Sequence, residues 1–179
     1  AGSSAYSSNT GRAYVFYADG TNNFGTATCS GSSPSVCSAT DADIKINGET
    51  TSNEFATAIA ADMNADGRTD LVVGAYRYGS YDGRVYIFFN DGSYPTTASS
   101  ADVILGGDVG AGSYFGSTIL TVDMNGDGRT DLVVGARGYS TGQGRLYFYE
   151  TRENFAWQIQ KQFTASTSPR TGLGGTGQE

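Results

Sequence analysis

The sequence has 179 residues, a formal net charge of −7, a hydrophobic fraction of 38% and no histidine. This length suits one well-packed domain, and the excess of acidic side chains argues against binding to the backbone of a nucleic acid. No apolar segment is long enough to span a membrane, and the lack of histidine removes the most common general base; we therefore predict no membrane span and no enzymatic activity.

Residues 1–54 are expected to form half of a β-structured unit. Apolar and aromatic runs at residues 11–17 and 42–46 predict two strands. Gly2 aligns with Gly135 of a later unit, so we expect the chain to start just after a hairpin of its first unit. Because the chain begins at Ala1 without Met, we also expect a processed or truncated product.

The two cysteines, Cys29 and Cys37, lie between these strands in a short segment rich in turn-forming residues. So short a loop closes easily, and we predict a disulfide, with a pair of buried free thiols as the alternative. Disulfides are typical of proteins outside the cytosol, so we expect an extracellular or cell-surface protein.

Two units of four strands follow, with equivalent residues 61 positions apart, as in Asp62 and Asp123 or Arg84 and Arg145. We name the strands of a unit A, B, C and D in chain order. The predicted strands cover residues 55–61, 71–75, 83–89 and 102–105 in the first unit, and 115–122, 132–136, 144–149 and 156–163 in the second. Arg12, Arg84 and Arg145 begin successive C strands; we expect them either to pair with acidic groups near a neighbouring loop or to be solvated.

An almost identical nonapeptide, Asp-Met-Asn-x-Asp-Gly-Arg-Thr-Asp, connects strands A and B in both units. Oxygen-bearing side chains at alternate positions of a tight loop are what calcium needs, and glycine permits the sharp bend. The predicted ligands are the side chains at positions one, three, five and nine and the backbone carbonyl at position seven. They are Asp62, Asn64, Asp66, Arg68 and Asp70 in the first loop, and Asp123, Asn125, Asp127, Arg129 and Asp131 in the second. We therefore predict two Ca²⁺ sites.

Two other interpretations of the nonapeptide are weaker. An acidic turn, in which Asp and Asn bond their own backbone, would explain one loop, but two copies with every ligand position kept favour calcium. An EF-hand is not expected, because Val73 and Val134 occupy the twelfth position and a β-branched run follows. The metal is therefore expected to hold a β-hairpin.

The Phe115-Gly116 pair, the Asp-rich loop and the following Leu-Val-Val-Gly-Ala together resemble the FG-GAP repeat of the β-propeller in integrin α-subunit N-terminal domains and related secreted proteins. The first copy departs from this pattern at Phe55-Ala56. The resemblance implies an all-β fold of four-stranded antiparallel propeller blades, with calcium in each A–B hairpin. We expect a half blade at 1–54, full blades at 55–114 and 115–163, and a Gly/Ser/Thr-rich tail at 164–179.

Two and a half blades are fewer than a closed propeller needs. Exposed sheet edges and apolar faces recruit partners, so we predict head-to-tail self-assembly into a homo-oligomer, filament or surface fibre. The first ten residues or the tail could act as the docking arm. A fragment of a larger propeller is the alternative.

A calcium-dependent adhesion or carbohydrate-binding (lectin-like) module is the other alternative function, because aromatic side chains bind sugars by stacking. The candidates follow strand B in both units: Tyr76, Tyr78, Tyr81 and Tyr139. Packing in the core or at its rim explains these tyrosines equally well. The sequence has no Asn-x-Ser/Thr sequon, so any attached glycan is expected at the Ser/Thr-rich residues 32–35, 96–97 or 164–169.

Overall fold

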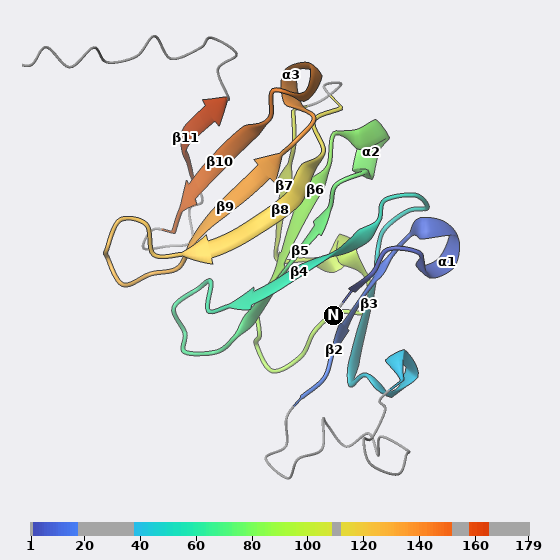
Figure 1. Ribbon diagram of the computed structural model, residues 1–179. Helices are drawn as coiled ribbons and strands as arrows, with labels where there is room; N and C mark the ends of the chain where they lie inside the picture. Colours follow the sequence, from blue (N-terminus) through green and yellow to red (C-terminus); the bar gives the residue numbers. More distant parts are fainter. Residues whose placement is uncertain (1, 18–37, 109–111, 152–157, 165–179) are drawn as a thin grey trace, which may run out of the picture.

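The computed structural model describes residues 2–17, 38–108, 112–151 and 158–164, in which the regular structure is mainly antiparallel β-sheet. Three sheets follow one another through the molecule (Figure 1). The half blade contains β1 (Gly2–Ser3), β2 (Arg12–Val15) and β3 (Ile44–Asn47). Blade 1 contains β4 (Phe55–Ala61), β5 (Asp70–Ala75), β6 (Arg84–Phe88) and β7 (Val103–Gly106). Blade 2 contains β8 (Phe115–Val122), β9 (Asp131–Ala136), β10 (Arg145–Glu150) and β11 (Gln158–Thr164).

Every strand predicted from the sequence is present, and the all-β, propeller-like fold is confirmed. Within each full blade the strands pair in chain order, so each blade is a simple antiparallel meander. The half blade contains one strand more than predicted, the two-residue β1. Gly2 pairs with Ala13 just as Gly135 pairs with Leu146, which confirms the alignment of Gly2 with Gly135. The half blade therefore keeps the end of a strand B.

Strand B of each full blade lies between strands A and C of its own sheet. All six residues of β5 and all six of β9 are buried. For β5 this is expected, because a neighbouring blade covers each of its faces. The face of blade 1 that points toward the half blade packs with Ala13 and Ile46, through Phe55, Val73 and Phe88. We call the face of each blade that points in this direction its inner face.

The opposite, outer face of blade 1 packs on the inner face of blade 2. Val72, Val85 and Ile87 from blade 1 form one buried cluster with residues of blade 2 that include Phe115 and Leu132. The core of the molecule is therefore not one centre but two interblade layers. Each blade needs a neighbour to bury its faces.

Three tight turns connect strand B to strand C: α1 (Tyr6–Asn9), α2 (Tyr78–Tyr81) and α3 (Tyr139–Gly142). The two central residues of each turn have positive φ, so these segments are left-handed turns rather than true helices. Two short 3₁₀ turns, Ala39–Asp41 and Ala98–Ser100, precede strand D in the half blade and in blade 1.

The arginine that begins each strand C stacks on the first tyrosine of the turn before it. The guanidinium carbons of Arg12, Arg84 and Arg145 lie 3.6, 3.7 and 3.5 Å from the ring centroids of Tyr6, Tyr78 and Tyr139, respectively. Such cation–π contacts orient the guanidinium toward the linker that joins consecutive blades.

Acidic residues in those linkers complete the arrangement. Arg84 forms an ion pair of 3.0 Å with Glu49, and Arg145 forms one of 3.3 Å with Asp108. The predicted pairing of these two arginines with acidic groups is thus confirmed. Arg12 instead donates from Nε to Oδ1 of Asn47 at 2.6 Å.

Candidate metal centre

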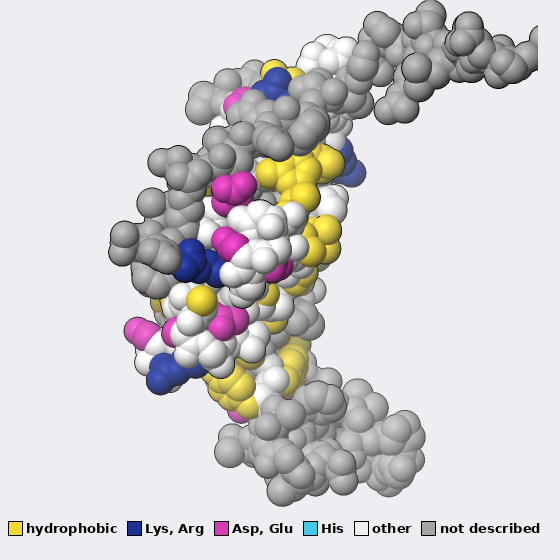
Figure 2. All heavy atoms as spheres, turned by 90° about the vertical axis from the view of Figure 1, so that its left-hand side faces the viewer, with side chains coloured by type: hydrophobic (Ala, Val, Ile, Leu, Met, Phe, Trp, Pro, Cys, Tyr) yellow, Lys and Arg dark blue, Asp and Glu magenta, His cyan; other side chains and the backbone are white. Residues whose placement is uncertain are grey.

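The two Asp-rich loops connect β4 to β5 and β8 to β9, on the same side of the molecule (Figure 1). Figure 2 looks onto that side, where acidic side chains lie over both full blades. The sequence produces these turns through a glycine at the sixth position. Gly67 and Gly128 have φ values of 82° and 83°, a conformation that costs other residues steric strain.

The first ligand position accepts two corresponding backbone N–H groups in both loops. One carboxylate oxygen of Asp62 accepts the N–H of Gly67 at 2.9 Å, and the other accepts the N–H of Asp66 at 3.2 Å. Asp123 accepts the corresponding N–H groups of Gly128 and Asp127 at 2.8 and 3.2 Å. Asp123 also accepts the N–H of Gly126 at 2.7 Å, and these bonds, that of Gly128 most of all, lower the pKa of Asp123 below its ordinary value. The carboxylate is therefore held ionised and turned into the loop.

The third and fifth positions also repeat. Oδ1 of Asn64 accepts the N–H of Asp66 at 3.1 Å, and Oδ1 of Asp66 accepts the N–H of Arg68 at 2.8 Å. The second loop has the same two bonds, at 2.9 Å to Asn125 and at 2.9 Å to Asp127. The two loops thus share these hydrogen bonds, and the second loop adds one, from the N–H of Gly126 to Asp123, where the first loop has Ala65.

The seventh position was predicted to contribute its backbone carbonyl, a role that does not need the arginine side chain. The side chain of Arg68 lies outside the loop, where its Nη1 donates to the carbonyl oxygen of Asn90 at 3.2 Å.

The ninth position has a second role that sequence reasoning missed. Asp70 and Asp131 are buried, and each holds the loop to the end of strand C in its own blade. Asp70 accepts the N–H groups of Met63 and Asn90, both at 2.8 Å. Asp131 accepts those of Met124 and Thr151, both at 3.0 Å. Burial raises the pKa of Asp70, although its two backbone hydrogen bonds oppose that shift.

The donor set of each loop suits a hard cation such as calcium, since it consists of carboxylate, amide and backbone oxygens. Among the described residues, no three acidic, cysteine or histidine side chains converge closely enough to form a cluster as they stand. In both loops the carboxylates instead point at backbone N–H groups. Calcium binding therefore requires the half-buried Asp62, the exposed Asp66 and their counterparts Asp123 and Asp127 to turn toward a common point.

We predict that Asp70→Asn and Asp66→Asn act differently in a chelating buffer. Asp70→Asn replaces one of two buried acceptor oxygens by an NH₂ group and should lower the free energy of unfolding by about 1–3 kcal/mol. Asp66→Asn keeps an oxygen that can accept the backbone N–H of Arg68, and the site is exposed. This substitution should therefore change the free energy of unfolding by less than about 0.5 kcal/mol. Chemical denaturation in chelator, repeated in calcium, measures both.

In calcium, both substitutions should lower stability, because each removes a charged ligand from the same loop. Equal destabilisation by the two variants in chelator would contradict the separate structural role of Asp70.

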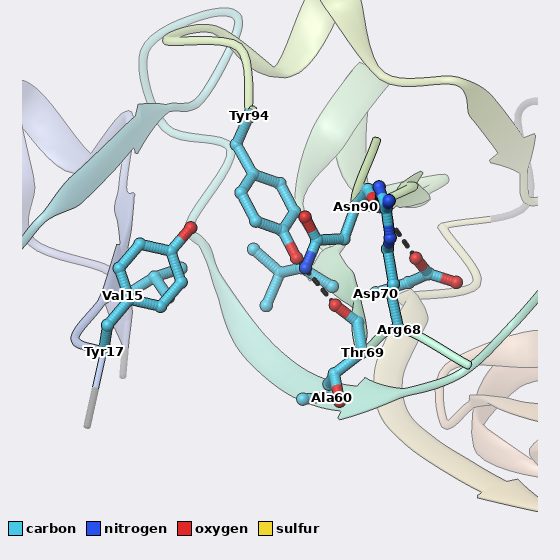
Figure 3. A pocket seen from close by; sticks show the side chains of 9 residues that line it. Val15, Tyr17, Ala60, Arg68, Thr69, Asp70, Asn90 and Tyr94 are labelled. Atoms are coloured by element: carbon cyan, nitrogen blue, oxygen red, sulfur yellow. Dashed lines mark hydrogen bonds between the residues drawn. The ribbon is translucent and has the colours of Figure 1, made fainter. Parts of the chain in front are cut away.

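A cavity of about 370 Å³ lies beside the first loop, between the half blade and blade 1. Figure 3 shows the rings of Tyr17 and Tyr94 on opposite sides of it, with Val15 from the half blade and Arg68 to Asp70 from blade 1. Tyr94 donates from its hydroxyl to the carbonyl oxygen of Thr69 at 2.8 Å. At the junction of blades 1 and 2, residues equivalent to Val15 and Leu71 are buried together with Met63. Among the described residues, no methionine lines the corresponding space between the half blade and blade 1.

The tyrosines considered for a sugar site fall into two groups. Tyr78 and Tyr139 lie under arginines, as described above. Tyr76 and Tyr81 gather around Tyr114, with ring centroids 6.1 and 5.1 Å from it. Arg137 lies 4.9 Å from the Tyr114 centroid, and the hydroxyl of Tyr76 donates to Glu54. Packing within the rim thus accounts for these rings.

The predicted disulfide between Cys29 and Cys37 lies outside the described residues, as do residues 165–179 of the predicted tail. Among the residues that the structure describes, no helix has the length and hydropathy needed to cross a membrane.

Stacked four-stranded blades, each with an Asp-rich hairpin on the same side, define a propeller-type module. The family model of the FG-GAP repeat matches residues 55–88 and 115–149, so the chain contains two FG-GAP repeats, as the sequence predicted. The matched segments run from strand A to strand C of each blade.

Curated relatives are similar over about half of this chain. Phosphatidylinositol-glycan-specific phospholipase D of Rattus norvegicus is 41% identical over 103 residues, which cover 50% of this chain and 12% of the relative. Integrin alpha-4 of Xenopus laevis is 35% identical over 101 residues, which cover 55% of this chain and 10% of the relative. The similarity is therefore to one module of much longer proteins.

Proposed function

We propose that the chain is a calcium-stabilised, extracellular structural module that self-assembles head to tail, with a filament or surface fibre as the extended product. The observation that carries this proposal is a contrast between the two full blades. Met63 of blade 1 is fully buried, whereas the equivalent Met124 of blade 2 is 53% exposed. Blade 1 covers its apolar outer face with blade 2, and blade 2 presents a similar face to solvent. Such a face is typical of an interaction surface.

The calcium part of the proposal is supported by the agreement between the loops. Corresponding hydrogen bonds recur at the first, third and fifth positions of both loops, which indicates one purpose for both, and the oxygen ligands that they offer suit Ca²⁺. The ion would join strands A and B of each blade and offset the repulsion among the loop carboxylates.

An extracellular, adhesion-type role is supported by three features. The donor-rich loops suit a calcium-rich medium, and the spacing of Cys29 and Cys37 suits an oxidising one. One relative is an integrin subunit. The net charge of −7 further favours repulsion from nucleic acids over attraction to them.

Catalysis and sugar binding are less well supported. One relative is named a phospholipase, but the match covers 12% of its length, and this sequence has no histidine to act as general base. Tyr78 and Tyr139 are already covered by guanidinium groups, which leaves these rings poorly placed to stack on a sugar. A structural role is therefore better supported than carbohydrate binding.

Sedimentation velocity of the full chain in calcium, over a series of micromolar concentrations, tests self-assembly. We expect the sedimentation coefficient to rise with concentration, and electron microscopy to show linear assemblies at the upper end. Leu120→Glu, on the open face, should suppress the rise because a buried unpaired carboxylate is costly. Ile104→Glu, at a comparably exposed residue outside that face, is the matched control. A monomer at every concentration would contradict the proposal.

A further inference from the structure

Arg137 follows strand B of blade 2 directly and does not recur in the other blades. The equivalent positions hold Tyr76 in blade 1 and Ser4 in the half blade. The arginines that begin each strand C do recur, and their contacts with the linkers belong to the fold of every blade. Arg137 is therefore an addition to the repeated fold, and it is exposed.

Tyrosine rings hold the guanidinium of Arg137 at the surface. They belong to a group of three, Tyr76, Tyr81 and Tyr114, at the end of the strands opposite to the Asp-rich loops (Figure 1). The guanidinium carbon of Arg137 lies 5.3 Å from the ring centroid of Tyr76 and 4.9 Å from that of Tyr114. Such cation–π contacts orient a long side chain before a ligand arrives, which lowers the entropy lost on binding. We call Arg137 and these three tyrosines the rim cluster.

The acidic side chains around the rim cluster are engaged elsewhere. Glu54 forms an ion pair of 2.6 Å with Arg77 through one carboxylate oxygen, and its other oxygen accepts the hydroxyl of Tyr76. Asp82 accepts a backbone N–H at 3.4 Å. Among the described residues, no acidic side chain forms an ion pair with Arg137. The positive charge of Arg137 is thus available to a ligand.

Two buried donors beside Glu54 also lack an acceptor among the described residues. They are Nε of Arg77 and Nδ2 of Asn53, a residue that is 3% exposed. The two residues are in contact, because the backbone N–H of Arg77 donates to the carbonyl oxygen of Asn53 at 3.4 Å. Buried polar groups are normally hydrogen-bonded, so donors exceed acceptors in this part of the molecule. This excess favours a ligand that accepts hydrogen bonds.

We infer that Arg137 and the rim cluster bind an isolated carboxylate of a protein partner, an Asp or Glu side chain flanked by uncharged residues. A guanidinium offers parallel N–H groups that match the two oxygens of a carboxylate. One carboxylate is enough to pair with Arg137, whereas a sulfated polysaccharide carries many negative charges and would be repelled by a chain of net charge −7. The site goes beyond the proposed self-assembly, since it lies at the ends of the strands and not on the outer face of blade 2.

A peptide with a single charge provides the test. The probe is acetyl-Gly-Gly-Glu-Gly-Gly-amide, and its matched control has Gln in place of Glu. Each peptide is titrated into the isotope-labelled full chain in calcium and at low ionic strength, at a protein concentration where the chain is monomeric. NMR follows the Nε–H group of Arg137 and the backbone amide of Gly138, the next residue. We expect saturable shifts of both signals with the Glu peptide and none with the Gln peptide.

Three variants make the test specific, and the amide of Gly138 reports on binding in all of them. Arg137→Gln removes the charge and should weaken binding of the Glu peptide at least about tenfold. Arg137→Lys keeps the charge but loses the planar fork, and should weaken binding by a smaller factor. Lys45→Gln removes the same charge from β3 of the half blade and should leave the affinity unchanged.

The inference is overturned if the Gln peptide shifts these signals as strongly as the Glu peptide, or if Arg137→Gln binds the Glu peptide as well as the natural chain does. An equal loss in Lys45→Gln would also contradict it, because the attraction would then depend on net charge alone. Dextran sulfate tests the other class of ligand. Tighter binding of dextran sulfate that depends on Arg137 would reject the protein carboxylate in favour of a sulfated polysaccharide.

Discussion

Removal of calcium is expected to lower the free energy of unfolding by about 2.7 kcal/mol for each loop, when free calcium had been present at about one hundred times the dissociation constant. The reason is that the ion binds only the folded hairpin and holds carboxylates that otherwise repel one another. Thermal unfolding in calcium and in excess chelator measures the effect. Calcium titration by calorimetry should give two ions per chain.

Two controls separate calcium from general ionic strength. Magnesium at the same concentration should restore much less stability, because it demands a smaller octahedral shell and releases its water reluctantly. A double Asp62→Asn, Asp123→Asn variant should lose most of the response to chelator. A melting temperature indifferent to chelation would refute both calcium sites.

Phe115→Ala is expected to destabilise the chain by about 3–5 kcal/mol, the largest effect of a single substitution here. Phe115 is completely buried at the junction of blades 1 and 2. Its ring packs edge-on against Tyr147 and Tyr149, with centroids 5.1 and 6.5 Å away. Truncation would leave a cavity in a layer that both blades need. Chemical denaturation, with the transition followed by far-UV circular dichroism, measures the loss.

The matched control for Phe115 is Leu146→Ala, on the open face of blade 2. Leu146 is 44% exposed, so its truncation should cost less than about 1 kcal/mol in the isolated chain. A loss as large as that of Phe115→Ala would mean that the outer face of blade 2 is covered in solution even in the monomer.

Much of the fold was predictable because the chain repeats itself. The 61-residue interval between Asp62 and Asp123 places each strand twice, and two weak local patterns that agree are stronger than either alone. Strand A of both blades was predicted to the residue, since Phe and the Asp-rich loop mark its two ends. The hydrogen-bonding partners at loop positions one, three and five follow from local geometry, in which Asp and Asn bond nearby N–H groups.

Contacts between distant segments were not predictable in the same way. The second hydrogen bond of Asp70 comes from Asn90, at the end of strand C, and no local pattern signals a buried carboxylate there. Arg84 stacks on Tyr78, six residues earlier in the chain, and this spacing does not bring side chains together in a regular helix or strand. The contact forms because a left-handed turn lies between the two residues. The recurrence of Tyr before each Arg at this spacing was the available signal.

The sequence by itself determined the units of this protein: the repeat, its strands, the Asp-rich loops and the FG-GAP resemblance. Each of these features is defined by the residue types within a short segment of the chain, so it can be recognised without knowledge of distant contacts. Only the tertiary structure decided which face of each blade is covered. Val85 and Leu146 occupy equivalent positions, yet one is buried and the other is 44% exposed, because burial depends on whether another blade lies beside the sheet. The same holds for Met63 and Met124, whose difference in exposure leads to the proposed self-assembly.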